Sequence, residues 1–188
     1  MNKKVAFHYP KLSSFDCGLF RSPGPGLGNL LFPISRALIG AERFSGRFVF
    51  PTLRQIKVGT FLRRDRDRRT YGNLLRSRTS EEWRDWLSAM CRTSLAEHQF
   101  DGSRSDVTVR YEGLGQYFHD LDGYRDLIAT WLRDSSREAF PQESFDIAIH
   151  VRLGDFTESM PAATGNNVRQ PLEWYRAAYD EARRRVEK

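Results

Sequence analysis

The sequence predicts a mixed α/β fold in which parallel strands are joined by helices. Two parts of the chain show this pattern: residues 15–51, interpreted as strand, loop, helix and strand, and residues 145–188, interpreted as strand, loop and helix. Alternating strands and helices are typical of a parallel sheet covered by helices on its faces. Hydrophobic residues make up 39% of the chain and aromatic residues 13%, which is enough apolar material for a packed core.

The first part begins with a short apolar segment, residues 15–20, that we expect to form a strand. The Gly/Pro-rich stretch at residues 22–26 follows it and predicts a turn. After the turn, apolar residues recur with helical spacing: Leu30, Leu31, Ile34, Leu38 and Ala41. Residues 47–51 are apolar again and indicate a second strand, which completes the pattern of a βαβ unit.

Further elements are expected before residue 140. Residues 63–69, RRDRDRR, form a charge run that we interpret as a solvated loop. Ser80 is expected to cap a helix with an apolar face formed by Trp83, Trp86, Leu87 and Met90. Alternation over residues 106–111 predicts a strand, and helical spacing after it predicts a helix containing Tyr124, Leu127, Ile128, Trp131 and Leu132.

A domain boundary is expected near residue 140. Residues 141–144 form a short polar connection, and the apolar run at 145–151 is consistent with a buried parallel strand. A polar loop at 154–170 and a helix from about Leu172 follow. Because the sequence stops within this second unit, we interpret residues 1–140 as one α/β domain and residues 141–188 as the beginning of a second, incomplete one.

Composition bounds the compartment and the partners. Cys17 and Cys91 are the only cysteines, so neither a disulfide framework nor a cysteine zinc site is predicted, and we expect a cytoplasmic protein. The N-terminus lacks the apolar core of a signal peptide, and the most apolar window, residues 27–41, is too short to span a bilayer. The net charge is +6, and five lysines leave 25 arginines among the 30 basic residues. Arginine suits phosphate-bearing partners, so a nucleotide, nucleic acid or peripheral contact with anionic lipid stays open, as does a general arginine bias of the genome.

His150, Arg152 and Asp155 occupy the point where the predicted strand at 145–151 meets its loop. Open α/β sheets bind ligands at the carboxyl ends of their strands. Positions 150 and 152 share one face of an extended strand, so the imidazole and the guanidinium can converge, and a guanidinium suits a diphosphate. An Arg152–Asp155 ion pair that only fixes the strand end is the alternative interpretation.

Two glycine-containing segments are further candidates. GPGLGN, residues 24–29, enters a helix whose N-terminal N–H groups can bind an anion or a sugar hydroxyl. A tight turn with Asn29 as the helix cap is the simpler explanation of this segment. YEGLGQYF, residues 111–118, places glycines and aromatic rings after a predicted strand. These rings can stack on a sugar, but packing in the core is the commoner use and is what we expect.

In their order along the chain, these three segments resemble the bacterial α-1,2-fucosyltransferases. GPGLGN followed by an apolar helix is similar to the GGLGNQ-type N-terminus of that family, YEGLGQYFHDLDGY to its GYxQxxxYF region, and IAIHVRLGDF to its HxRRxD motif. PLEWYRAAYDEA, residues 171–182, resembles the tyrosine-rich helix that follows the motif. The α-1,6- and protein O-fucosyltransferases share the first and third segments more loosely.

The resemblance implies an inverting, metal-independent glycosyltransferase with a GT-B-like fold of two Rossmann-like domains, acceptor side first and GDP-fucose side second. It implies that Arg152 neutralises the β-phosphate of the leaving GDP, where charge develops as the glycosidic bond breaks. His150 would orient the phosphate or the nucleotide, and Asp155 would hold the loop. Residues of the first domain would face the same cleft: Gly26, Gly28 and Asn29.

Two positions qualify the resemblance. Leu153 stands where the family motif has its second arginine, which removes one phosphate donor. Inversion needs a base that takes the proton of the acceptor hydroxyl, and the nearest carboxylates to the motif are Asp155 and Glu158. Because a guanidinium rather than a carboxylate cluster is expected at the diphosphate, no metal or other cofactor is expected, and activity should survive chelation.

The expected partners are therefore a sugar nucleotide and a glycan acceptor, of the surface-polysaccharide or O-antigen type, without nucleic acid. A nucleic-acid-binding module would use the charge run at 63–69, but two aspartates interleave with its five arginines and no aromatic residue lies within it. A non-catalytic glycan-binding domain is the other alternative, and it would bind glycan without any effect of GDP. The acceptor, the linkage and the oligomeric state are not specified by these residues.

Overall fold

The computed structural model describes residues 5–56, 70–138 and 171–186. Contacts divide the chain into two compact units, Met1–Phe140 and Pro141–Lys188, and each is described by itself. The charge run at 63–69, the strand expected at 145–151 and the loop expected at 154–170 lie outside the described residues.

The first unit is built on a parallel four-stranded sheet. Its strands are β1 (Phe7–Pro10), β2 (Arg47–Phe48), β3 (Thr93–Ala96) and β4 (Val107–Tyr111), in the order β2-β1-β4-β3. All three pairings are parallel, and His8 in β1 lies opposite Phe48 in β2 and Val109 in β4. The predicted α/β class is confirmed, and this sheet is compatible with a Rossmann-like fold.

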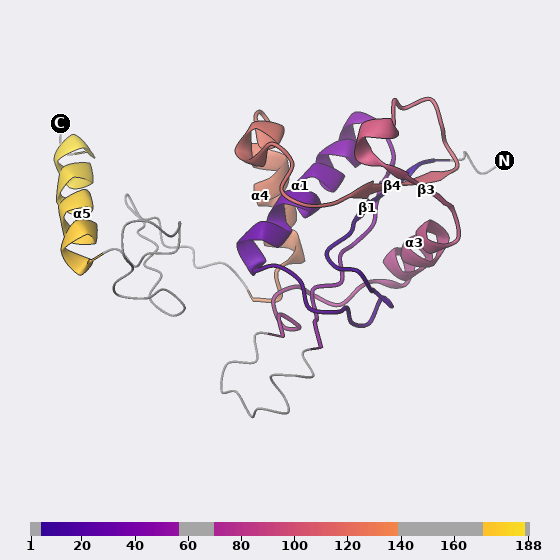
Figure 1. Ribbon diagram of the computed structural model, residues 1–188, viewed down its shortest axis with the longest axis horizontal. Coiled ribbons are helices and arrows are strands. Elements are labelled where there is room, and N and C mark those ends of the chain that lie inside the picture. Colours follow the sequence, from indigo (N-terminus) through magenta and orange to yellow (C-terminus); the bar gives the residue numbers. More distant parts are fainter. Residues whose placement is uncertain (1–4, 57–69, 139–170, 187–188) are drawn as a thin grey trace, which may run out of the picture. The chain divides into compact units, whose positions relative to one another are not determined.

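Helices cover both faces of the sheet, with α1 (Leu27–Arg43) on one face and α3 (Ser80–Met90) on the other (Figure 1). Successive side chains of a strand point to opposite faces, and the two core clusters follow this period. Ala37 of α1 packs with four buried residues of the sheet region: Ala6, Val107, Val109 and Tyr111. Trp86 and Ala89 of α3 pack with residues of the opposite face: Phe7, Tyr9 and Val49.

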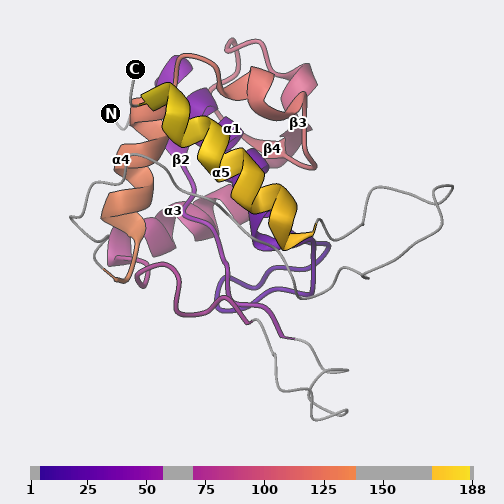
Figure 2. The same cartoon turned by 90° about the vertical axis from the view of Figure 1, so that its left-hand side faces the viewer.

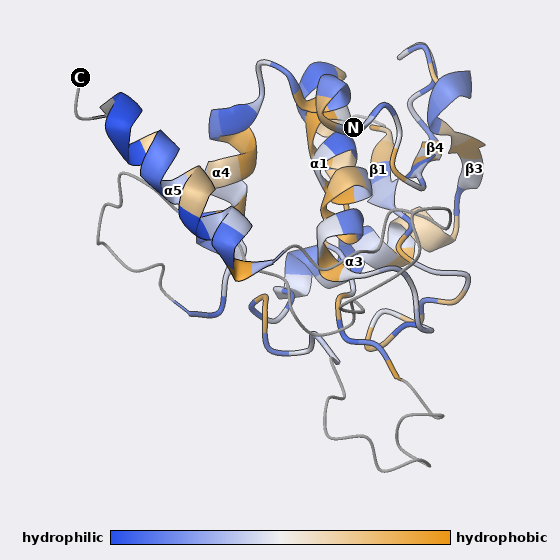
Figure 3. Cartoon of the chain, turned by 60° about the vertical axis from the view of Figure 1, so that its left-hand side comes forward, coloured by the Kyte–Doolittle hydropathy of each residue, from blue (hydrophilic) through white to orange (hydrophobic). Residues whose placement is uncertain are grey.

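Helix α4 (Arg125–Ser135) belongs to the first unit and helix α5 (Leu172–Val186) to the second. In the first unit, α4 lies beside α1 (Figure 2), and its Trp131 ring meets Phe48 edge-on with centroids 5.5 Å apart. Short 3-10 helices, η1 (Glu97–Gln99) and η2 (Tyr117–Leu121), flank β4. In the second unit, α5 confirms the helix expected from Leu172, and most of its surface is hydrophilic (Figure 3).

The strand expected at residues 15–20 is wrong. These residues form a turn in which the Asp16 carboxylate accepts a hydrogen bond of 2.7 Å from the Gly18 N–H, and Gly18 has φ of 84°. Phe15 and Leu19 are 55% and 66% exposed, so the apolar letters do not mark a buried segment. The first strand is β1. All four of its residues are buried, but its histidine, tyrosine and proline do not give the apolar pattern expected of a buried strand.

Two expectations for α3 are also corrected. The N-cap is Thr79, whose hydroxyl accepts from the Glu82 N–H at 3.2 Å, while the Glu82 carboxylate accepts from the Thr79 N–H at 2.7 Å. The buried face holds Trp86 and Ala89, whereas Leu87 and Met90 are 55% and 40% exposed. The sheet therefore contacts the helix on a face rotated from the one that the apolar spacing indicates.

Candidate functional site

A crevice of about 530 Å³ lies outside the carboxyl ends of β1 and β4. We call it the β1/β4 crevice; its lining comes from residues 11–14 after β1, from Pro25, Asn29, Leu30 and Pro33 around the start of α1, and from residues 112–114 after β4. β1 and β4 are neighbours in the sheet but distant in the chain. Open α/β sheets bind their ligands in this position.

The N-terminus of α1 supplies hydrogen-bond donors at this crevice. Gly26 is the N-cap, no side chain caps the helix, and the first turn carries no acidic residue. The N–H groups of Asn29 and Leu30 reach back to the Gly26 carbonyl at 3.0 and 3.2 Å, while those of Leu27 and Gly28 precede any intrahelical acceptor. Asn29 is therefore not the cap that the sequence suggested, because it is the third residue of the helix and lines the crevice.

Pro33 affects the hydrogen bonding of the Asn29 backbone carbonyl. Proline has no N–H, so the Asn29 carbonyl lacks the donor that a helix normally provides four residues later. Asn29 and Pro33 both line the crevice. The side-chain amide and the backbone carbonyl of Asn29 together give this wall donors and an acceptor, which are the groups that bind sugar hydroxyls.

Gly26 and Gly28 are not required by the fold of the described residues. Gly26 has φ of −62°, Gly28 has no positive φ, and a Cβ at either position would meet no atom within 4 Å. Alanine would favour the helix at position 28. Glycine at these two positions instead leaves the backbone open to the close approach of a ligand.

Arg36 positions the opposite wall. Its guanidinium, only 7% exposed, donates from Nη2 to the carbonyls of Glu112 and Gly113 at 2.7 and 3.0 Å, and from Nη1 to the Glu97 carboxylate at 2.7 Å. Burial raises the pKa of Glu97, and the charge of Arg36 opposes this rise. Helix α1 thus holds the loop after β4 in place. An arginine within the apolar window at 27–41 was a signal of this buried contact.

Lys11 and Glu112 form an ion pair in the lining of the crevice. Lys11 Nζ lies 3.1 Å from Glu112 Oε1, and the two side chains are 30% and 50% exposed. The Lys11 ammonium can bind a phosphate, and the Glu112 carboxylate can accept the proton of a hydroxyl. Both groups become available to a substrate that breaks their ion pair. The sequence analysis missed Lys11 because it placed the first strand at 15–20, and it included Glu112 only as part of the segment 111–118, without a role.

The structure brings together two of the three segments singled out in the sequence. Asn29 and residues 112–114 line one crevice, with Gly26 and Gly28 at the start of the same helix. The third segment, with His150, Arg152, Asp155 and Glu158, lies outside the described residues.

The core packing expected for the aromatic residues after β4 is wrong for two of them. Tyr117 and Phe118 are 55% and 75% exposed and meet the edge of the Phe32 ring, with centroids 6.0 and 5.2 Å away. Tyr111 alone of this group is buried, because it ends β4 on the face covered by α1. The glycines between them, Gly113 and Gly115 with φ of 64° and 59°, turn the chain away from the sheet.

The described part of the chain contains no group of three histidine, cysteine, aspartate or glutamate side chains able to hold a metal ion, and no helix long and apolar enough to cross a membrane. Asp120 and Asp122 have the D-x-D spacing, but the Asp120 carboxylate accepts from the Gln116 N–H at 2.7 Å and lies 3.9 Å from Arg36. Metal independence stays a prediction.

No protein-family model, curated protein or solved structure matches this chain.

Proposed function

We propose that the chain is part of a glycosyltransferase that moves fucose from GDP-fucose to a glycan hydroxyl with inversion, forming an α-1,2 linkage. The observation that carries the proposal is the β1/β4 crevice: Asn29 and Glu112, from two segments 83 positions apart that both resemble the fucosyltransferases, line one cavity. The proposal includes a GT-B-like arrangement in which residues 141–188 begin the nucleotide-binding domain.

The proposed reaction assigns one role to each group. The acceptor oxygen attacks C1 of fucose, its proton passes to a carboxylate, and the bond from C1 to the β-phosphate oxygen breaks as GDP leaves. Arg152 neutralises the charge that develops on that phosphate, and His150 orients it. Asp155 and Glu158 remain candidates for the base. We add Glu112 as a third candidate, since among the described residues it is the carboxylate that lines the crevice.

The start of α1 has a supporting role in this proposal. The N–H groups of its first turn, which have no acceptor among the described residues, and the positive end of the helix dipole attract an anionic or hydroxyl-rich substrate. The space above Gly26 and Gly28 admits the substrate close to the backbone. Lys11 and Asn29 then provide the side-chain contacts from this domain.

Fucose transfer by the natural protein tests the proposal. With radiolabelled GDP-fucose and a galactose-terminated oligosaccharide, Arg152→Ala should lower transfer about a thousandfold, because one preorganised donor at a developing charge contributes about 3–4 kcal/mol. Arg84→Ala is the matched control, since Arg84 is an exposed arginine on α3 and its loss changes the net charge equally. Undiminished transfer by Arg152→Ala, or transfer that EDTA abolishes and Mg²⁺ restores, would contradict the proposal.

The base is tested in the same assay. Glu112→Gln, Asp155→Asn and Glu158→Gln each keep the shape of the side chain while removing the proton acceptor. The variant that lowers kcat most, with the least change in KM for GDP-fucose, identifies the base.

A further inference from the structure

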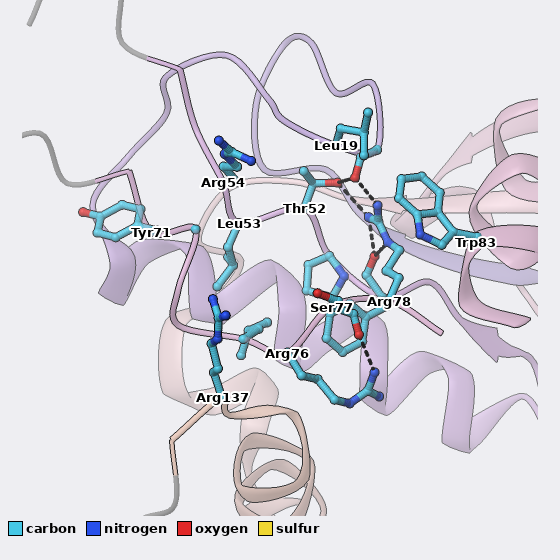
Figure 4. A pocket seen from close by; sticks show the side chains of 15 residues that line it. Leu19, Thr52, Leu53, Arg54, Tyr71, Arg76, Ser77, Arg78, Trp83 and Arg137 are labelled. Atoms are coloured by element: carbon cyan, nitrogen blue, oxygen red, sulfur yellow. Dashed lines mark hydrogen bonds between the residues drawn. The ribbon is translucent and has the colours of Figure 1, made fainter. Parts of the chain in front are cut away.

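A second cavity, of about 310 Å³, lies beside the chain that leaves β2, between residues 50–54, residues 71–78 and Arg137 (Figure 4). It shares no lining residue with the β1/β4 crevice. Among the described residues that line it, none is acidic and four are arginines: Arg54, Arg76, Arg78 and Arg137. We call this cavity the arginine pocket.

Arg78 and Arg76 are fixed by the protein. Arg78 donates to the Phe50 carbonyl and to the Thr52 hydroxyl, both at 2.7 Å, and to the Gly18 carbonyl, and it lies 4.9 Å from the centre of the Trp83 ring. All of these partners are uncharged. Arg76 makes two hydrogen bonds to the Glu82 carboxylate, at 2.9 and 2.7 Å. Of the two guanidinium charges, the one on Arg76 is therefore directly neutralised.

The side chains of Arg54 and Arg137 have guanidinium N–H donors available for a ligand. Arg54 is exposed; its backbone carbonyl accepts a hydrogen bond of 2.9 Å from the Arg21 N–H, while within the described ranges its side chain makes no hydrogen bond or ion pair. Arg137 is also exposed, and its side chain donates to the neutral Asn73 Oδ1 at 3.0 Å. The backbone of Arg137 is held by a hydrogen bond of 3.1 Å to the Leu74 carbonyl, and its neighbour Ser136 pairs with Leu75. The side chain of Arg137 thus projects from a fixed point.

The charge balance of this cavity favours an anion. Among the described residues, four guanidinium groups line the cavity and no carboxylate does. Glu82 pairs with Arg76, and the charges of Asp16 and Glu82 act on Arg78 from outside the lining. Like charges around a partly enclosed cavity repel one another more strongly than in bulk water, and a bound anion relieves this repulsion. Guanidinium groups hold phosphate oxygens through paired, charge-assisted hydrogen bonds.

We propose that the arginine pocket binds the phosphate or diphosphate group of a small phosphorylated ligand. Arg54 and Arg137 donate to the phosphate oxygens, Arg78 supplies positive charge from the inner wall, and the rings of Tyr71 and Trp83 flank the ligand. The volume lies at the lower end of the range for small-molecule sites, which suits a sugar phosphate or diphosphate rather than a nucleic-acid strand. This proposal rests on residues of the first unit and does not depend on Arg152, the donor phosphate partner proposed above.

Titration of the 188-residue chain with inorganic pyrophosphate, monitored by calorimetry at an ionic strength of about 0.15 M, tests this site. Arg54→Ala and Arg137→Ala should each weaken binding about tenfold, as expected for the loss of a hydrogen bond to a charged group. Arg84→Ala, which removes one exposed positive charge outside the pocket, should leave the affinity within about twofold because exposed charges are screened.

Four outcomes would overturn the proposal. The first is absence of saturable pyrophosphate binding, and the second is an equal loss of affinity in Arg84→Ala, which would indicate a general effect of net charge. The third is loss of binding in Arg152→Ala with no change in Arg54→Ala and Arg137→Ala, which would place the phosphate at the proposed donor site instead. A single-stranded DNA oligonucleotide that binds more tightly than pyrophosphate, through the same two arginines, would likewise contradict a small-ligand site.

Discussion

At the scale of single residues, the centre of the sheet contains an uncharged histidine. His8 is fully buried, its Nδ1 lies 2.8 Å from the Tyr111 hydroxyl, and its ring stacks on Phe44 with centroids 6.1 Å apart. Burial lowers the pKa of His8 from 6.5 to about 4 and raises the pKa of Tyr111. Gly46 makes room for the ring, because a Cβ there would lie 2.6 Å from it.

Because burial lowers the pKa of His8, we predict that the protein loses stability in mild acid. Between pH 6.5 and 4 the unfolded chain binds a proton at His8 that the folded chain does not, so the stability is complete above 6.5 and falls as the pH decreases toward 4. The free energy of unfolding should drop by about 2 kcal/mol from this group between pH 7 and pH 5. Urea unfolding of His8→Gln, compared with the parent at both pH values, should show a smaller drop.

The control for this experiment is His119→Gln, because His119 is exposed. It should keep the pH dependence of the parent. An identical pH dependence in His8→Gln and the parent would show that His8 is not held neutral by burial.

Gly28 gives a prediction with opposite effects on stability and binding. The position is helical and open, so Gly28→Ala should raise the free energy of unfolding by about 0.5 kcal/mol. If the substrate approaches the backbone there, the added methyl should weaken GDP-fucose binding about tenfold or more. Thermal unfolding and calorimetric titration measure the two effects. Ser88→Ala in α3 is the control, with improved helix propensity and unchanged binding; unchanged binding in Gly28→Ala as well would remove this glycine from the site.

At the scale of elements, the start of α3 depends on the pair Thr79 and Glu82. Thr79→Ala should lower the free energy of unfolding by about 1 kcal/mol, because it leaves the Glu82 N–H without its acceptor. Ser80→Ala, one residue along, should change it by less than about 0.5 kcal/mol, since Ser80 lies inside the helix and caps nothing. Denaturant unfolding distinguishes the two, and a larger loss for Ser80→Ala would restore the cap that the sequence suggested.

The elements found from the sequence are those with long periodic patterns. The helices at α1, α4 and α5 and the strand at β4 follow the predicted residues, because each repeats its apolar positions over several turns or alternations. β1 was missed because it contains His8, which the sequence alone suggests to be an exposed polar residue. Its burial depends on Tyr111, which lies 103 positions away in the chain. β3 was missed because its four residues are partly exposed and form the edge of the sheet.

At the scale of the whole first unit, the strand order creates the candidate site. β1 and β4 pair in parallel, and this single pairing brings the residues after β1, the start of α1 and the loop after β4 to one edge of the sheet. The sequence indicated Asn29 and the Glu112 segment separately, from local composition. It could not indicate that they meet, or that Lys11 and Arg36 complete the walls, because these contacts depend on a strand pairing between distant parts of the chain.

The central claim is that the β1/β4 crevice contacts GDP-fucose. Its most direct test is the amide NMR spectrum of the ¹⁵N-labelled protein during titration with GDP-fucose. We predict saturable shifts of the amide signals of Gly26, Gly28, Asn29 and Gly113, which surround the crevice, and no shift of Arg84 on α3. Saturation of the protein with GDP-fucose while these four signals stay unchanged, or absence of binding altogether, would contradict the account.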